Sequence, residues 1–134
     1  MPTTKVHLRN IEGTQASMGW AGSHTVVVDR PDGHAQGMGL GFNGAQLLGL
    51  AIGGCFCNDL RYVAAERGVT LGTIQISVTI ELEGDSIIAT KALVDVVCRT
   101  AGGDEANDIV DAARARCMMS NSLNRGVPVA FASA

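Results

Sequence analysis

Residues 44–67 read GAQLLGLAIGGCFCNDLRYVAAER, and from position 47 to position 54 every side chain is apolar or small. A helix that is apolar on all sides must be buried on all sides. The stretch is too short, and becomes charged too soon, to span a bilayer, which needs roughly 20 apolar residues. We therefore expect a buried central helix around which the rest of the chain packs. This helix carries two thiols, Cys55 and Cys57.

The composition is that of a folded domain with no affinity for nucleic acid. With 134 residues, 46% of them hydrophobic and 17% charged, the chain is expected to be a single domain over 1–134 with a substantial core. The net charge is -3 and no basic run occurs, which argues against a nucleic-acid partner. Residues 1–10 contain no apolar export segment, so we expect a cytoplasmic protein whose four cysteines stay reduced or redox-active.

The sequence on the amino-terminal side of the central helix predicts a small antiparallel sheet. Short strands are expected over residues 5–10, 14–20 and 24–29. Residues 31–43 form a glycine-rich loop that lacks a phosphate-binding motif, and its glycines favour close approach of the backbone to another segment. Asn43 is the expected N-cap of the central helix.

The sequence on the carboxyl-terminal side predicts a hairpin, a second helix and a last strand. Gly68 should end the central helix. Residues 73–83 alternate apolar and polar side chains, and residues 86–99 supply a partner strand. A helix is expected to begin at Asp104 and pass through Cys117, with a helical or turn-like run continuing over residues 120–125 until Gly126 stops it. A last short strand is expected over residues 127–131. The order β-β-β-α-β-β-α-β, with strands in antiparallel runs, predicts an α+β fold.

Two cysteines far apart in the sequence are the candidates for chemistry. Cys55 and Cys117 each fall within a predicted helix, and a disulfide between them requires Cα atoms within roughly 7 Å. The alternative is that both are ordinary core cysteines, which are among the most buried residue types. Cys57 points about 200° away from Cys55 on a helix, so a CxC metal site is disfavoured and no metal is expected. Cys98 falls in a strand and is most simply a core residue.

The remaining titratable residues give no catalytic pattern. His7, His24 and His34 fall in strands or in the glycine-rich loop, and none is assigned to catalysis. Asp59 and Glu66, on the second half of the central helix, are interpreted as part of a solvated face rather than as an acid/base pair.

The segments around the two cysteines resemble those of the OsmC/Ohr superfamily of peroxide-handling proteins. Residues 41–48, GFNGAQLL, followed by GCF at 54–56, are similar to the family pattern G-x-N-P-x-[EQ]-L-L…A-C-[FT]. Residues 117–123, CMMSNSL, followed by VPV at 127–129, are similar to the pattern C-P-V-S-[NA]-x-L…V-P-V. The order of the expected elements agrees with that of the family, so the resemblance covers nearly the whole chain.

The resemblance implies an OsmC-like fold with a central buried helix, assembled as an intertwined homodimer whose two active sites are built from both chains. It implies Cys55 as the peroxidatic thiol and Cys117 as the resolving thiol. The implied reaction is the reduction of organic hydroperoxides or hydrogen peroxide in the response to oxidative stress. An external dithiol would supply the electrons, with no metal, haem or flavin and no membrane or nucleic-acid partner.

The chain departs from the family pattern at four places. Ala45 stands where the best-studied branch has a glutamate, residues 13–18 lack the arginine expected beside the peroxidatic thiol, and Met118 replaces a proline. The pair Asn58-Asp59 after Cys57 is also unusual for the family. An arginine near a thiol lowers its pKa and stabilises charge on the leaving oxygen. Two alternatives to the peroxidase are therefore kept: a non-enzymatic protein that binds a small apolar or electrophilic ligand, and a thiol redox sensor.

Overall fold

The computed structural model describes residues 1–85 and 88–132, in the order β1-β2-β3-α1-β4-β5-α2-α3. The predicted α+β class is confirmed. The strands form two antiparallel sheets, and helices follow each group of strands rather than each single strand. The chain divides into two compact units, Met1–Leu47 and Leu48–Ala134, and each is described by itself. Among the described residues, none of the helices combines the length and the hydropathy that crossing a bilayer requires.

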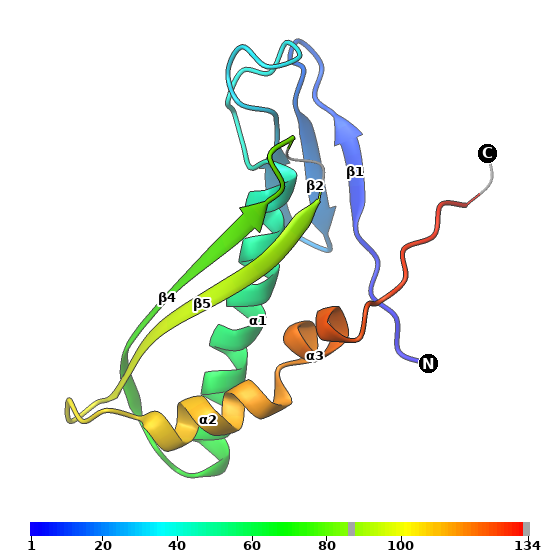
Figure 1. Ribbon diagram of the computed structural model, residues 1–134. Coiled ribbons are helices and arrows are strands. Elements are labelled where there is room, and N and C mark those ends of the chain that lie inside the picture. The colour runs from blue at the N-terminus through cyan, green and yellow to red at the C-terminus, as the bar shows by residue number, and fades with distance from the viewer. Residues whose placement is uncertain (86–87, 133–134) are drawn as a thin grey trace. The chain divides into compact units, whose positions relative to one another are not determined.

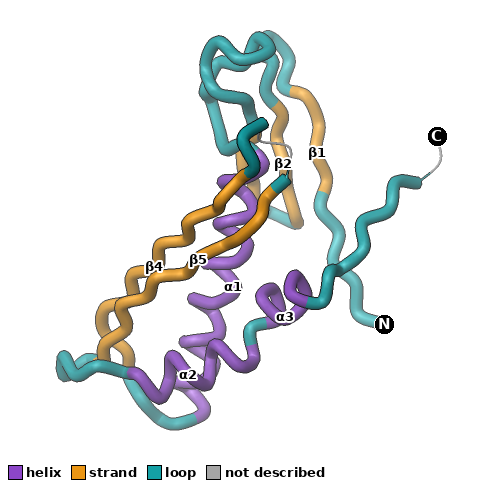
Figure 2. Tube along the Cα trace, in the orientation of Figure 1, coloured by secondary structure: helices purple, strands orange, loops and turns teal. Residues whose placement is uncertain are grey.

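The first unit contains the predicted three-stranded meander. Strands β1 (His7–Asn10), β2 (Ser17–Ala21) and β3 (His24–Val28) pair antiparallel in the order β1-β2-β3. They are drawn as orange segments in Figure 2. All three are shorter than the sequence pattern suggested, because the residues before β1 and β2 find no strand partner among the pairs formed.

The glycine-rich loop that follows β3 is organised by one buried carboxylate. Asp29 accepts backbone hydrogen bonds from Leu40 at 3.0 Å, Met38 at 3.1 Å and Arg30 at 2.7 Å. The Leu40 N–H is the largest cause of a lowered pKa for the Asp29 carboxyl. The expectation of close backbone approach holds at Gly41, where a Cβ would lie 2.1 Å from the Val27 carbonyl oxygen.

Helix α1 (Gly44–Glu66) starts and ends where the sequence signals place its ends. The Asn43 side chain accepts the Gln46 N–H at 2.9 Å, and the Gln46 side chain accepts the Asn43 N–H at 2.9 Å. This reciprocal pair is a capping box, and it confirms Asn43 as the N-cap. At the other end Gly68 has φ +66°, the left-handed conformation that closes a helix.

The second unit is built on a long hairpin that lies along α1 (Figure 1). Strands β4 (Leu71–Leu82) and β5 (Ala89–Thr100) pair antiparallel, and Ser86 and Ile87 of the expected partner strand lie outside the described residues. Gly53 of α1 faces β4 closely, since a Cβ there would lie 3.1 Å from a Val78 methyl group. Small residues on α1 thus let the helix approach the apolar face of the hairpin.

The core of the second unit lies where α1, the start of the hairpin and α2 (Asn107–Arg116) meet. Leu60 is completely buried, and the cluster includes both Cys98 and Cys117. The other members are Phe56, Val63, Ala64, Leu71, Ala106, Ile109, Val110 and Ala113. The expectation that Cys98 is a core residue is therefore confirmed.

The second predicted helix is two helices, with Cys117 between them. Cys117 has φ -63° and ψ 112°, an extended conformation, and α3 (Met118–Asn124) begins directly after it. The prediction that Cys117 lies inside a helix is therefore wrong. The expected start at Asp104 is also too early, because the Ala106 N–H donates to the Cys98 carbonyl at 3.0 Å and so continues the pairing with β5.

The predicted strand over residues 127–131 does not form. These residues pair with no strand among residues 1–85 and 88–132, and the Phe131 side chain is 95% exposed. A strand needs a hydrogen-bonding partner, and an apolar sequence alone does not supply one.

The expectation that α1 is buried on all sides is wrong for the single chain. Leu50 is 51% exposed and Tyr62 is 58% exposed, whereas Ile52, Phe56 and Leu60 are buried. One face of the helix therefore packs on the core of the second unit, and another face, apolar at Leu50, is open.

Candidate functional site

The two cysteines singled out by the sequence lie together in the second unit. The sulfur atoms of Cys55 and Cys117 and a carboxylate oxygen of Asp59 all lie within 4.8 Å of one another. Both cysteines are free thiols. Since a disulfide bond is about 2.05 Å long, forming one here requires the two side chains to move closer.

Two elements of secondary structure bring these three groups together. Cys55 and Asp59 are four positions apart on α1, which places their side chains on one face of the helix. Cys117, at the junction between α2 and α3, is only 2% exposed and belongs to the core of this unit. The break in the helix at Cys117 thus sits beside the face of α1 that carries Cys55 and Asp59.

Asp59 is the member of this site that the sequence interpretation missed. It is 8% exposed, and its Oδ2 atom accepts a hydrogen bond from the Cys55 thiol at 3.7 Å. The interpretation as a solvated face holds only for Glu66, which forms an exposed ion pair with Arg116 at 2.8 Å. The spacing of four residues from Cys55 was the signal in the sequence that pointed to Asp59.

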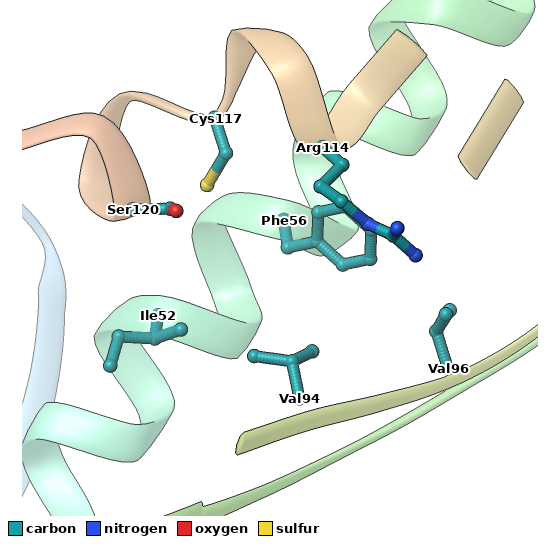
Figure 3. A pocket seen from close by; sticks show the side chains of 7 residues that line it. All are labelled: Ile52, Phe56, Val94, Val96, Arg114, Cys117 and Ser120. Carbon is teal, nitrogen blue, oxygen red and sulfur yellow. The ribbon is translucent and has the colours of Figure 1, made fainter. Parts of the chain in front are cut away.

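A small cavity of about 70 Å³ opens beside Cys117. Figure 3 shows its lining: Ile52 and Phe56 from α1, Val94 and Val96 from β5, and Arg114, Cys117 and Ser120. The cavity has room for a few water molecules or a small solute. Its walls are mostly apolar, and Arg114 is the cation among the lining residues.

Burial raises the pKa of the Cys117 thiol, and the neighbouring Cys55 and Asp59 add to this rise, while the nearby Ser120 backbone N–H opposes it. Burial likewise raises the pKa of Cys98, with Arg61 opposing the effect. A buried thiolate is disfavoured because it loses its hydration. Cys117 is therefore held as a neutral thiol at neutral pH.

The two raised pKa values predict that the reduced protein loses stability in alkali. The unfolded chain releases these protons near pH 9.0, whereas the folded chain holds them to a higher pH. Above about pH 9 the unfolded state binds fewer protons than the native state, so the free energy of unfolding falls as the pH rises. Urea unfolding between pH 7 and 10.5 measures this fall, which should be shallower in Cys98→Ala. If the free energy of unfolding falls equally steeply in Cys98→Ala, the raised pKa of Cys98 does not contribute to the loss of stability.

Cys57, the other thiol of α1, is not part of the cluster. It lies beside Cys55 in sequence but is absent from the group formed by Cys55, Asp59 and Cys117.

The model of the OsmC-like protein family matches residues 35–132, which is most of the chain. The chain belongs to the OsmC-like family. Its family resemblance, inferred above from the two cysteine segments, is thus confirmed. A search of curated proteins finds no match to this chain.

Solved structures of OsmC-like proteins share this fold. An OsmC-like protein from Mycoplasma pneumoniae superposes with a TM-score of 0.73 at 16% identity, covering 94% of this chain and 89% of that one. An organic hydroperoxide resistance protein OsmC from Legionella pneumophila gives 0.64 at 22% identity, over 94% and 91%. The organic hydroperoxide resistance protein OhrB of Bacillus subtilis gives 0.57 at 28% identity, over 93% and 92%.

Proposed function

We propose that this OsmC-like chain is a thiol-dependent peroxidase that reduces organic hydroperoxides or hydrogen peroxide. The observation that carries the proposal is the proximity of the Cys55 and Cys117 sulfurs to each other and to the Asp59 carboxylate. The names of similar structures, which include organic hydroperoxide resistance proteins, support the same class of substrate.

Cys55 is proposed as the attacking thiol. It is half-buried, whereas Cys117 is sealed and held protonated, so Cys55 is the more accessible of the two. Asp59, which already accepts the Cys55 hydrogen bond, takes up the thiol proton. The sulfur attacks the O–O bond, the leaving oxygen takes a proton and departs as alcohol or water, and Cys55 becomes a sulfenic acid.

Cys117 is proposed as the resolving thiol. Its sulfur attacks the sulfenic sulfur of Cys55, one water leaves, and the Cys55–Cys117 disulfide forms. The sulfur positions within 4.8 Å support this step, because the resolving thiol needs only a local side-chain movement. An external dithiol, taken from a reducing cytoplasm, returns both cysteines to thiols by disulfide exchange.

Arg114 is proposed to stabilise the charge that develops on the leaving oxygen. The family's arginine is missing from residues 13–18, and Arg114 lines the cavity that contains Cys117 (Figure 3). Among the interactions of residues 1–85 and 88–132, its guanidinium takes part in no ion pair. A cation with no fixed partner at the mouth of an apolar cavity is suited to an oxyanion.

The test is to map the disulfide that forms on oxidation. The reduced chain is treated with one equivalent of cumene hydroperoxide, the remaining thiols are counted, and the disulfide is located by peptide mass spectrometry. We expect two of the four thiols to disappear and one Cys55–Cys117 link to appear, with the loss preserved in Cys98→Ser. Unchanged thiols in the presence of excess hydroperoxide would refute the proposed function.

The intertwined homodimer and the single domain over 1–134 are also proposed for this chain. Support comes from the apolar side chains that the single chain leaves open, among them Leu50 on α1, Leu93 and Val97 on β5, and Phe131 in the tail. Exposed apolar residues on consecutive packed elements are typical of a surface that another subunit covers.

Leu50→Asp is expected to convert the dimer to a monomer. The substitution puts a charge on the open apolar face of α1, and a charge buried in an interface without a partner is strongly unfavourable. Light scattering coupled to gel filtration gives the mass, and far-UV circular dichroism confirms that the variant is folded. A wild-type chain that is monomeric at every concentration, or a Leu50→Asp chain that stays dimeric, would contradict this interface.

The second candidate function is binding of a small apolar or electrophilic ligand without turnover. The apolar cavity beside Cys117 favours it. The two candidates differ in the fate of the thiols: a ligand-binding protein would leave hydroperoxide unconsumed, and an electrophile would add its own mass to one cysteine rather than join two.

A further inference from the structure

We propose that the reduced chain binds one Zn²⁺ ion through the Cys55 sulfur, the Cys117 sulfur and the Asp59 carboxylate. These three groups come from two separate parts of the second unit and converge on one point. The proposal shares residues with the proposed peroxidase but does not depend on it, because metal binding requires only that both thiols be reduced.

The spacing of the three ligand atoms fits a tetrahedral ion. Zinc binds thiolate sulfur at about 2.3 Å and carboxylate oxygen at about 2.0–2.2 Å, so tetrahedral ligand atoms lie roughly 3.3–3.8 Å apart. The three atoms here lie within 4.8 Å of one another before any ion draws them together. Closing the remaining difference requires only that the side chains of Cys55, Asp59 and Cys117 rotate.

The kinds of ligand atom favour zinc over the harder cations. Two sulfurs and one oxygen suit a borderline-soft ion, whereas Mg²⁺ and Ca²⁺ prefer oxygen alone. Three protein ligands leave a fourth position for an exchangeable water molecule, and Cys117 also lines a cavity of about 70 Å³ that has room for one. The predicted site is therefore a three-ligand site with one exchangeable position.

Asp59 is a buried carboxylate whose nearby positive charge is not in direct contact with it. Among the interactions of residues 1–85 and 88–132, no lysine or arginine forms a hydrogen bond or ion pair with Asp59, although the charge of Arg116 acts on it from farther away. Its neighbours are instead the thiols of Cys55, which donates a hydrogen bond to it, and Cys117. Buried anionic groups are commonly paired with a cation or coordinate a metal, and a divalent ion would supply the missing positive charge here.

Zinc and the disulfide compete for the same two sulfurs. If a hydroperoxide oxidises the loaded site, two thiolates give up two electrons to form the disulfide, while the hydroperoxide and two protons become alcohol and water, and Zn²⁺ is released. Zinc is therefore bound by the reduced chain alone. The bound ion also shields both thiols from alkylation.

The experiment uses the full reduced chain after treatment with a chelator and anaerobic desalting. Zn²⁺ is titrated in competition with a chromophoric chelator, and Co²⁺ is titrated separately because its thiolate charge-transfer absorption reports sulfur ligands. We expect one ion per chain, a cobalt–thiolate band, and release of protons as the thiols ionise. Absence of the cobalt–thiolate band at equimolar metal would overturn the proposal.

The variants identify the ligands. Cys55→Ser and Cys117→Ser should lose the cobalt–thiolate band or halve it, and Asp59→Asn, which preserves shape, should weaken zinc binding at least about tenfold. Cys57→Ser is the matched control on the same helix and should bind as the wild type does. Circular dichroism checks that each variant is folded. Unchanged binding in Asp59→Asn, or loss of binding in Cys57→Ser, would overturn the three-ligand assignment.

The outcomes separate this inference from the proposed function. A chain that binds one zinc ion through these ligands but leaves hydroperoxide unconsumed supports the metal site and refutes the peroxidase. A chain that forms the Cys55–Cys117 disulfide but shows no cobalt–thiolate band supports the peroxidase and refutes the metal site.

Discussion

Cys55→Ser is expected to lower the rate of hydroperoxide consumption at least about a thousandfold, because removal of a covalent nucleophile costs several orders of magnitude in rate. A serine hydroxyl in the same place ionises far less readily than a thiol and cannot pass through a sulfenic acid. The measurement is the consumption of cumene hydroperoxide by the chain in the presence of dithiothreitol, with the rate in buffer subtracted.

Cys57→Ser is the matched control for this prediction. Cys57 lies two positions from Cys55 on α1, about 200° around the helix, and takes no part in the group that Cys55 forms with Asp59 and Cys117. Its replacement should leave the rate unchanged. If Cys55→Ser keeps the wild-type rate, or if Cys57→Ser loses it, the nucleophile has been assigned to the wrong thiol.

Leu60→Ala is expected to lower the free energy of unfolding by about 2–5 kcal/mol, the usual cost of emptying a fully buried leucine site. Leu60, on α1, is completely buried in the core cluster that also holds Cys117. Since a domain of this kind is stable by only about 5–15 kcal/mol, the variant should melt far below the wild type. Urea unfolding of the reduced chain gives the value.

Tyr62→Ala provides the control for Leu60→Ala. Tyr62 lies two positions away on the same helix but is exposed, with its ring 6.0 Å from the Arg116 guanidinium. Such an exposed cation–π contact contributes about 0.5–1 kcal/mol, so this variant should be much closer to the wild type. Equal losses in the two variants would show that α1 does not pack as described.

The local signals in the sequence predicted the elements well where short-range chemistry decides them. The alternation over residues 73–83 became β4, Asn43 and Gln46 cap α1, and Gly68 ends it. Each of these depends on neighbouring residues alone: a period of two, a side chain that reaches the helix start, and a residue that tolerates positive φ.

The failures of prediction all concern contacts between distant segments. The second helix breaks at Cys117, where the backbone is extended. No proline or glycine stands there that could have predicted the break. Residues 127–131 carry a strand-like sequence but find no partner strand in the part of the chain that the structure describes. Asp59 was predicted to be exposed to solvent because most carboxylates in proteins are. Its burial became apparent only from its place beside Cys55 and Cys117 in the structure.

The candidate site was predicted in part. Cys55 and Cys117 were chosen from their sequence context, and the structure brings their sulfurs together. Arg114 could not be found from the sequence, since its place in the cavity wall depends on how α2 lies against β5. A pattern along the chain identifies the reactive atoms more readily than it identifies the charges around them.

The interruption at Cys117 also decides which part of the molecule an oxidation would disturb. Helix α3, all of which lies within the described residues, contributes no buried residue and reaches the core through half-buried Met119. If the proposed disulfide forms, a Cys117 sulfur pulled toward Cys55 would therefore shift a short, weakly anchored segment more readily than α1. The mechanical cost of the proposed redox cycle would fall mainly on the carboxyl-terminal end of the chain.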